Sequence, residues 1–240
     1  MASAQSTGRR AAAALTAYAV LAGVVVAWGW MLTHTWSAVD GPDDRVSRWF
    51  ASQRSGALDP VAEVGTFLGE TVVGLVVAAV VAVAAGLALR SLLAAALVLV
   101  ADVGDGGIYW LASHADPRDR PPVQILDAGL VADHSFPSGH VGTATAVYGA
   151  AALLLAVWLR RRHQTGPGWL LVGVLALLPA YVALSRLYQG AHHVTDVGTS
   201  LVFGAVWLGV LVAATRLWPG REERVPGSSG GLPDPSVPHR

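Results

Sequence analysis

Residues 133–140 read DHSFPSGH, and residues 141–159, which follow directly, read VGTATAVYGAAALLLAVWL without a single charge. The uncharged run is close to the ~20 residues that a helix needs to cross a bilayer. A group of histidine, hydroxyl and acidic side chains therefore stands at the predicted start of a membrane span. Polar groups in this position indicate function more often than packing.

The composition of the chain is that of an integral membrane protein. Of its 240 residues, 53% are hydrophobic and only 13% are charged, which is too few charges for a soluble domain of this size. The formal net charge is zero, so nothing supports nucleic-acid binding. The lack of cysteine excludes disulfides and thiolate chemistry, and all 16 basic residues are arginines.

Six segments have the length and polarity of spanning helices, so we predict an all-α, polytopic membrane protein. They cover residues 11–32, 71–89, 92–112, 141–159, 169–184 and 197–217. We assign 1–10 to a cytoplasmic N-terminus, 11–218 to the six-helix domain, and the Pro-, Gly- and Ser-rich 219–240 to a disordered cytoplasmic tail. The first segment also resembles a signal peptide, but its length and the spans after it favour a transmembrane helix.

The segment between the first two spans, residues 34–70, mixes aromatic and charged side chains. Trp36, Trp49 and Phe50 are interspersed there with arginines and aspartates, as expected for a segment at the membrane interface. We interpret it as a structural interfacial or re-entrant helix, with a gate for substrate as the alternative.

The placement of arginine predicts the orientation of the chain. With the N-terminus in the cytoplasm, the inner loops carry Arg90 and the cluster RRRH at residues 160–163, whereas the outer loops carry most of the acids. We therefore predict a multi-pass protein of the cell membrane with both termini cytoplasmic. Three polar stretches then lie together on the outer side, at helix ends: residues 114–122, 136–140 and 185–196.

Two features of these stretches predict a phosphate site. Pro137 suits the first turn of a helix and Ser135 a cap before it, so the backbone N–H groups of Ser138 and Gly139 would face an anion. A direct phosphate contact is the alternative for Ser135. Guanidinium groups, which match phosphate oxygens in geometry, come from three arginines: Arg118, Arg120 and Arg186.

Histidines and one aspartate complete a set of residues for attack on phosphorus. His192 and Asp196 are four residues apart and share one face of a helix, so the carboxylate can hold one imidazole nitrogen and leave the other as a nucleophile. We predict that His192 forms a phosphohistidine, while His140 protonates the leaving oxygen and then activates water. His193, three residues before Asp196, is the alternative nucleophile.

These residues also resemble a known family, the integral membrane branch of the type-2 phosphatidic-acid phosphatases. Its pattern is K-x6-R-P, then P-S-G-H, then S-R-x5-H-x3-D; residues 137–140 match the second part and residues 185–196 the third. In the first part Arg120 is present, but Ser113 occupies the lysine position, so His114 or Arg118 is the candidate substitute.

The resemblance implies a lipid phosphatase that needs no metal or cofactor and acts at the extracytoplasmic face. It implies that the arginines and PSGH bind phosphate, that His192 is the nucleophile oriented by Asp196, and that His140 is the acid. The expected substrate is a lipid phosphate monoester or a diphosphate, of the phosphatidate or polyprenyl type. The alternatives are specifically an undecaprenyl-diphosphate phosphatase, or a non-catalytic phosphate-binding protein or transporter. The expected partners are this substrate and membrane lipids, without nucleic acid, and the oligomeric state stays open.

Two acids, Asp102 and Asp105, fall within the third predicted span. Acids inside a span are costly and usually face the bundle interior or a wet cavity. We interpret them as structural hydrogen-bonding groups, and a polar wall beneath the active site is the alternative.

Overall fold

The structure, a computed structural model, describes residues 2–35 and 37–217, and within these ranges all regular secondary structure is helical. The helices are α1 (Ala2–His34), α2 (Ser37–Ser52), α3 (Asp59–Gly69), α4 (Thr71–Leu89), α5 (Leu92–Ala115), α6 (Gly139–Arg161), α7 (Gly168–Tyr188) and α8 (Val194–Thr215). Six of them, all except α2 and α3, are long and apolar enough to cross a membrane. The predicted all-α, six-span fold is confirmed.

Helix α6 is the central element of the bundle. It is the most buried of the spans and packs against α4, α5, α7 and α8. Small residues allow this close packing: a Cβ added to Gly74 would lie 2.2 Å from Thr143 Cγ2, and one added to Gly104 would lie 2.5 Å from Trp207 Nε1. Helices in a bilayer associate largely through such close backbone approach.

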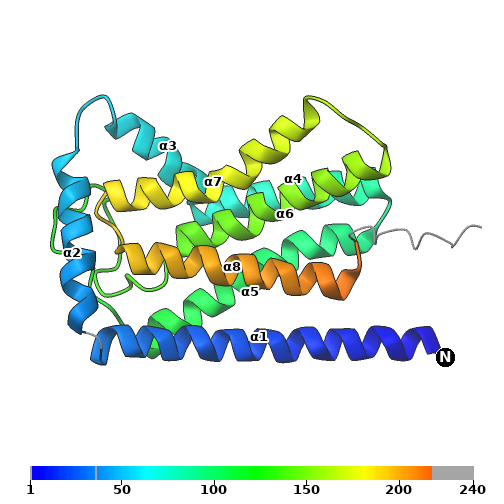
Figure 1. Cartoon of the computed structure of the whole chain (residues 1–240), viewed down its shortest axis with the longest axis horizontal. Coiled ribbons are helices and arrows are strands. Elements are labelled where there is room, and N and C mark those ends of the chain that lie inside the picture. The colour runs from blue at the N-terminus through cyan, green and yellow to red at the C-terminus, as the bar shows by residue number, and fades with distance from the viewer. Residues whose placement is uncertain (1, 36, 218–240) are drawn as a thin grey trace, which may run out of the picture.

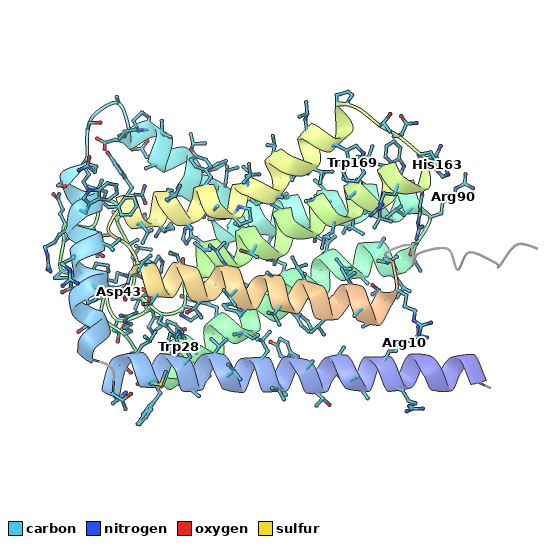
Figure 2. All side chains as sticks on the ribbon, viewed as in Figure 1. Arg10, Trp28, Asp43, Arg90, His163 and Trp169 are labelled. Atoms are coloured by element: carbon cyan, nitrogen blue, oxygen red, sulfur yellow. The ribbon has the colours of Figure 1, made fainter. Side chains whose placement is uncertain are left out.

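The polar helix ends gather at one end of the bundle. Helix α2 lies across this end, where α5 and α7 finish and α6 and α8 begin, while α1 runs along the side formed by α5 and α8 (Figure 1). Figure 2 shows Asp43 at this end, whereas Arg10, Arg90 and His163 lie toward the opposite end. The predicted separation of an arginine-rich end from the end with the polar stretches is therefore present in the fold.

The structure corrects the predicted start of the fourth span. Helix α6 begins at Gly139 with Ser138 as its N-cap residue, so Pro137 precedes the first turn and Ser135 is not the cap. The segment predicted as interfacial contains two helices, α2 across the bundle end and α3 packed against α7. The tail predicted at residues 219–240 lies outside the described residues.

Candidate active site

A cavity of about 490 Å³ opens at the polar end of the bundle, between α4, α5 and α6 and the loop that precedes α6. It brings together four of the predicted site residues, which line its wall: Arg120, Gly139, His140 and His192. These residues come from three separate stretches of sequence. The fold therefore brings the helix ends together, as predicted.

His192 is buried, and its ring is held by the loop before α6. Nδ1 of His192 lies 2.7 Å from the carbonyl oxygen of Ser135. A carbonyl oxygen only accepts hydrogen bonds, so Nδ1 carries the proton and Nε2 keeps its lone pair. Burial, and next the positive charge of Arg186, hold the pKa of His192 well below its ordinary value. The imidazole is therefore neutral, as a nucleophile must be.

Asp196 acts on His192 through this loop and not directly. Its Oδ2 lies 3.9 Å from His192 Nδ1, beyond hydrogen-bond range, but it accepts a bond of 2.6 Å from the Ser135 hydroxyl and one of 2.8 Å from the His193 backbone N–H. The expectation that the carboxylate holds the imidazole is corrected accordingly: Asp196 fixes Ser135, whose carbonyl holds the ring. Neither sequence reading of the Ser135 hydroxyl, cap or phosphate contact, matches this role.

The neighbouring histidine faces a different set of groups. His193 is the N-cap residue of α8, with Nδ1 3.3 Å from Asp196 and Nε2 3.6 Å from Asp44. It lines an outer polar cavity and is absent from the lining of the cavity that holds His140. The arrangement favours His192 over His193 as the nucleophile.

Arg118, predicted as a phosphate contact, does not line this cavity and is held by carboxylates. Its Nη1 donates to Asp196 at 2.6 Å and to Thr195 at 2.7 Å, and its Nη2 donates to Asp43 at 3.1 Å. Burial lowers the pKa of Arg118, but the two carboxylates outweigh burial and raise it. Arg118 thus ties α2 to α8 and balances the charge of Asp196.

Arg186 is fully buried at the end of α7, and only part of its guanidinium has protein partners. Nη1 donates to Asp127, Gln189 and Thr66 at 2.8–3.1 Å, whereas Nε and Nη2 have no partner among the described residues. Buried N–H groups without partners are costly. These two groups are therefore available for an anion.

Arg120 lies close to Arg186 and is held by backbone carbonyls. Its nitrogens donate to the carbonyls of Val131, His134 and Ala191 at 2.6–3.1 Å. Burial, followed by the positive charge of Arg186, lowers the pKa of Arg120. Two guanidinium groups that repel each other in a buried place are stabilised by a bound anion.

The start of α6 contributes further donors to the same place. The hydrogen-bond ladder of α6 begins with the N–H of Gly142, which donates to the Ser138 carbonyl at 2.9 Å, so the first-turn N–H groups before Gly142 have no partner within the helix. The Ser138 hydroxyl is buried and also has no partner among the described residues. The N-terminus of α6 and the Ser138 hydroxyl thus add donors beside the cavity that Arg120 and Gly139 line.

Neither Ser113, which occupies the lysine position, nor His114, one of its two predicted substitutes, lines the cavity. Ser113 is fully buried, with its hydroxyl 3.3 Å from the Trp110 carbonyl. His114 stacks on Trp110, has Nδ1 2.8 Å from the Trp110 carbonyl and does not line the cavity, so the prediction of His114 as a substitute is not supported. Besides His140 and His192, the cavity is lined by a third histidine, His134, which the sequence alone did not assign to the site.

Comparison with known proteins now adds to this geometry. Residues 87–219, more than half of the chain and including every motif residue of the cavity, match the sequence profile of the PAP2 superfamily. The chain belongs to the PAP2 superfamily. The resemblance predicted from the sequence to the membrane phosphatases of this superfamily is confirmed.

Two curated PAP2 relatives share the matched region. Sphingosine-1-phosphate phosphatase 2 of Homo sapiens is 39% identical over 82 residues, which are 34% of this chain and 19% of that protein. The Mus musculus protein of the same name is 34% identical over 95 residues, 40% of this chain and 24% of that protein. The matches therefore span only about a fifth to a quarter of the length of these relatives.

A solved PAP2 structure shares the fold. The transmembrane PAP2-type phosphatidylglycerolphosphate phosphatase from Bacillus subtilis superimposes with a TM-score of 0.63 over 84% of this chain and 94% of that chain. The sequences are 22% identical, so this similarity concerns the arrangement of the helices.

Proposed function

We propose that this protein is a membrane lipid phosphate phosphatase that works through a phosphohistidine on His192. The observation that carries the proposal is the neutral His192 ring, with its proton fixed on Nδ1, in a cavity that Arg120 and His140 also line. Buried donors of Arg186, whose charge acts on His192, and of Ser138, which precedes the cavity residue Gly139, have no partner among the described residues. A nucleophile beside donors suited to an anion is the arrangement that phosphoryl transfer requires.

The reaction follows from the placement of the donors. Arg120, Arg186 and the N–H groups at the start of α6 bind the equatorial phosphate oxygens, and Nε2 of His192 attacks phosphorus. As the bond to the lipid oxygen breaks, His140 gives that oxygen its proton. His140 then takes a proton from water, which hydrolyses the phosphohistidine to inorganic phosphate and restores His192. Acid–base help of this kind contributes about 10²–10⁴ in rate.

The lipid character of the substrate is supported by the open side of the cavity. Among its lining residues, Leu75 on α4 and Val103 and Trp110 on α5 have half or more of their surface exposed on the apolar outside of the bundle. In a bilayer this surface meets acyl chains. A lipid can therefore enter sideways between α4 and α5, with its phosphate at His192 and its chain still in the membrane.

Within lipid phosphates, we propose a phosphate monoester as the substrate. The curated relatives are named for sphingosine-1-phosphate and the solved relative for phosphatidylglycerolphosphate, both of which carry a monoester. A polyprenyl diphosphate, including the undecaprenyl carrier, is the competing class. Phosphate release by the purified protein in detergent, measured on a panel of lipid monoesters and polyprenyl diphosphates, decides between them.

The non-catalytic alternative is tested with the same assay. We expect His192→Ala and His140→Ala each to lower phosphate release by at least about 10², while the matched control His163→Ala, exposed at the opposite end of the bundle, keeps wild-type activity. A wild-type protein that releases phosphate from no lipid, or histidine variants with full activity, would point instead to a phosphate-binding protein or transporter.

A further inference from the structure

The cavity of His140 and His192 also has an acidic end, which the proposed mechanism does not use. Asp102 and Asp105 of α5 line the same cavity. Asp105 is 1% exposed, and neither of its carboxyl oxygens has a partner among the described residues. This location matches the alternative reading of the two acids, a polar wall beneath the active site, and not the expected set of internal hydrogen bonds.

The Asp105 carboxyl lies against α6, just below the anion site. A Cβ added to Gly142 would come within 2.2 Å of Asp105 Oδ2, so the carboxyl contacts the backbone of α6 at Gly142. Gly142 follows Gly139 by three residues, which is about 4.5 Å along a helix axis. The carboxyl is therefore about one helical turn deeper in the bundle than the N–H groups that bind phosphate.

The polar side chains packed around Asp105 donate elsewhere. The Tyr18 hydroxyl of α1 donates to the Gly104 carbonyl at 2.9 Å, the Thr145 hydroxyl of α6 to Val141 at 2.7 Å, and the Trp207 indole of α8 to Val100 at 3.3 Å. Each of these donors serves a backbone carbonyl of its own or a neighbouring helix. Asp105 lines the cavity, so a donor or cation bound there is within its reach.

We infer that Asp105, assisted by Asp102, is a subsite for a protonated amine of the substrate, placed on the carbon next to the phosphorylated carbon. The cavity then has two poles: Arg120 and Arg186 bind the phosphate, and the two carboxyls bind the ammonium group about one helical turn away. A bound ammonium group offsets the free-energy cost of burying acids inside a span, whereas an uncharged lipid chain does not. The inference rests on the proposed function and narrows its substrate class to long-chain 2-amino-alkyl phosphates.

The test compares three substrates of equal chain length in detergent: a 2-amino-alkyl phosphate, its 2-hydroxy analogue and the plain alkyl phosphate. We expect kcat/KM of the wild-type protein to be about tenfold higher for the amine than for the other two, as a charge-assisted hydrogen bond provides. Asp105→Asn keeps the shape but loses the charge, so it lowers kcat/KM for the amine toward that of the plain phosphate. The plain phosphate serves as the internal control for folding.

A matched control removes an acid at the same end of the bundle but outside the cavity. Asp119→Asn, at an exposed position, should keep the wild-type preference for the amine. Equal rates for the three substrates, or an unchanged preference in Asp105→Asn, overturn the subsite; if that variant does not fold, the wild-type preference alone decides. Absence of phosphate release from all three substrates contradicts the proposed function itself.

Discussion

Nδ1 of His192 donates a hydrogen bond of 2.7 Å to the carbonyl oxygen of Ser135. The Ser135 hydroxyl in turn donates to Asp196 at 2.6 Å, and the other oxygen of Asp196 accepts from Arg118 at 2.6 Å. One chain of buried polar contacts therefore runs from the nucleophile back to α2, where Asp43 holds Arg118. Such outer contacts determine the tautomer and the aim of a catalytic histidine.

Ser135→Ala tests whether the loop positions the nucleophile. The variant keeps the carbonyl but removes the hydroxyl that ties the loop to Asp196, so we expect kcat to fall about 10-fold or more while KM changes little. Removing one partner of a buried charged hydrogen bond should also lower the free energy of unfolding by about 1–3 kcal/mol. Ser52→Ala, at an exposed site in α2, is the control. A kcat equal to wild type would contradict the positioning role.

The lowered pKa of His192 predicts a dependence of stability on pH. In the unfolded chain the pKa of His192 returns to its ordinary value of 6.5. Below that pH, the unfolded state therefore binds a proton at His192 and the folded state does not. Stability is therefore highest above pH 6.5 and falls on acidification by up to about 1.4 kcal/mol per pH unit from this residue. Melting temperatures of His192→Asn in detergent should fall less between pH 7 and pH 5 than those of wild type. A parallel fall would show that His192 is not held neutral; His163→Asn should behave as wild type.

Substitution of the two buried arginines, Arg118 and Arg186, should have different effects on stability and on activity. Arg118→Gln leaves Asp43 and Asp196 without their cation, so we expect a loss of about 3–5 kcal/mol in the free energy of unfolding. Arg186→Lys removes the two guanidinium N–H groups that have no partner among the described residues and that we assign to phosphate, so we expect a fall of about 10² in kcat/KM with a smaller change in stability. Thermal melts and kinetics on the same preparations separate the two. A large loss of stability in the lysine variant would assign Arg186 to structure.

Topology is testable because the chain has no cysteine. We predict that a membrane-impermeant maleimide labels Asp119→Cys in intact cells and labels Gln164→Cys only after permeabilisation. Both positions are exposed and lie in loops, so access to the reagent, not burial, determines labelling. The reverse pattern would place the active site on the cytoplasmic face.

Local spacing was enough to predict much of the molecule. Each predicted span lies within or close to a helix of the structure, because apolar length alone determines what crosses a bilayer. His192 and His140 were identified from the short motifs that contain them, and the fold brings both to one cavity.

The contacts that support these residues were not predictable, because they join distant parts of the chain. Thr195 and Asp43 are 152 residues apart and bond at 2.5 Å, and Asp127 reaches Arg186 from a loop that has no motif. The sequence also placed Arg118 among the phosphate ligands, because it lies near the motif residue Arg120. The sequence does not show whether such an arginine contacts a bound anion or, as here, two aspartates. The orientation of a side chain follows from tertiary packing, which no local pattern contains.

The phosphohistidine is the central claim, and chemical trapping tests it most directly. The wild-type protein and His140→Ala, which should retain the intermediate longer, are mixed with a radiolabelled lipid phosphate monoester, quenched in alkali and digested. We predict an acid-labile, alkali-stable label on the peptide that contains His192, and its absence in His192→Ala. Phosphate release without any protein-bound label in either protein, or a label that persists in His192→Ala, would contradict the mechanism.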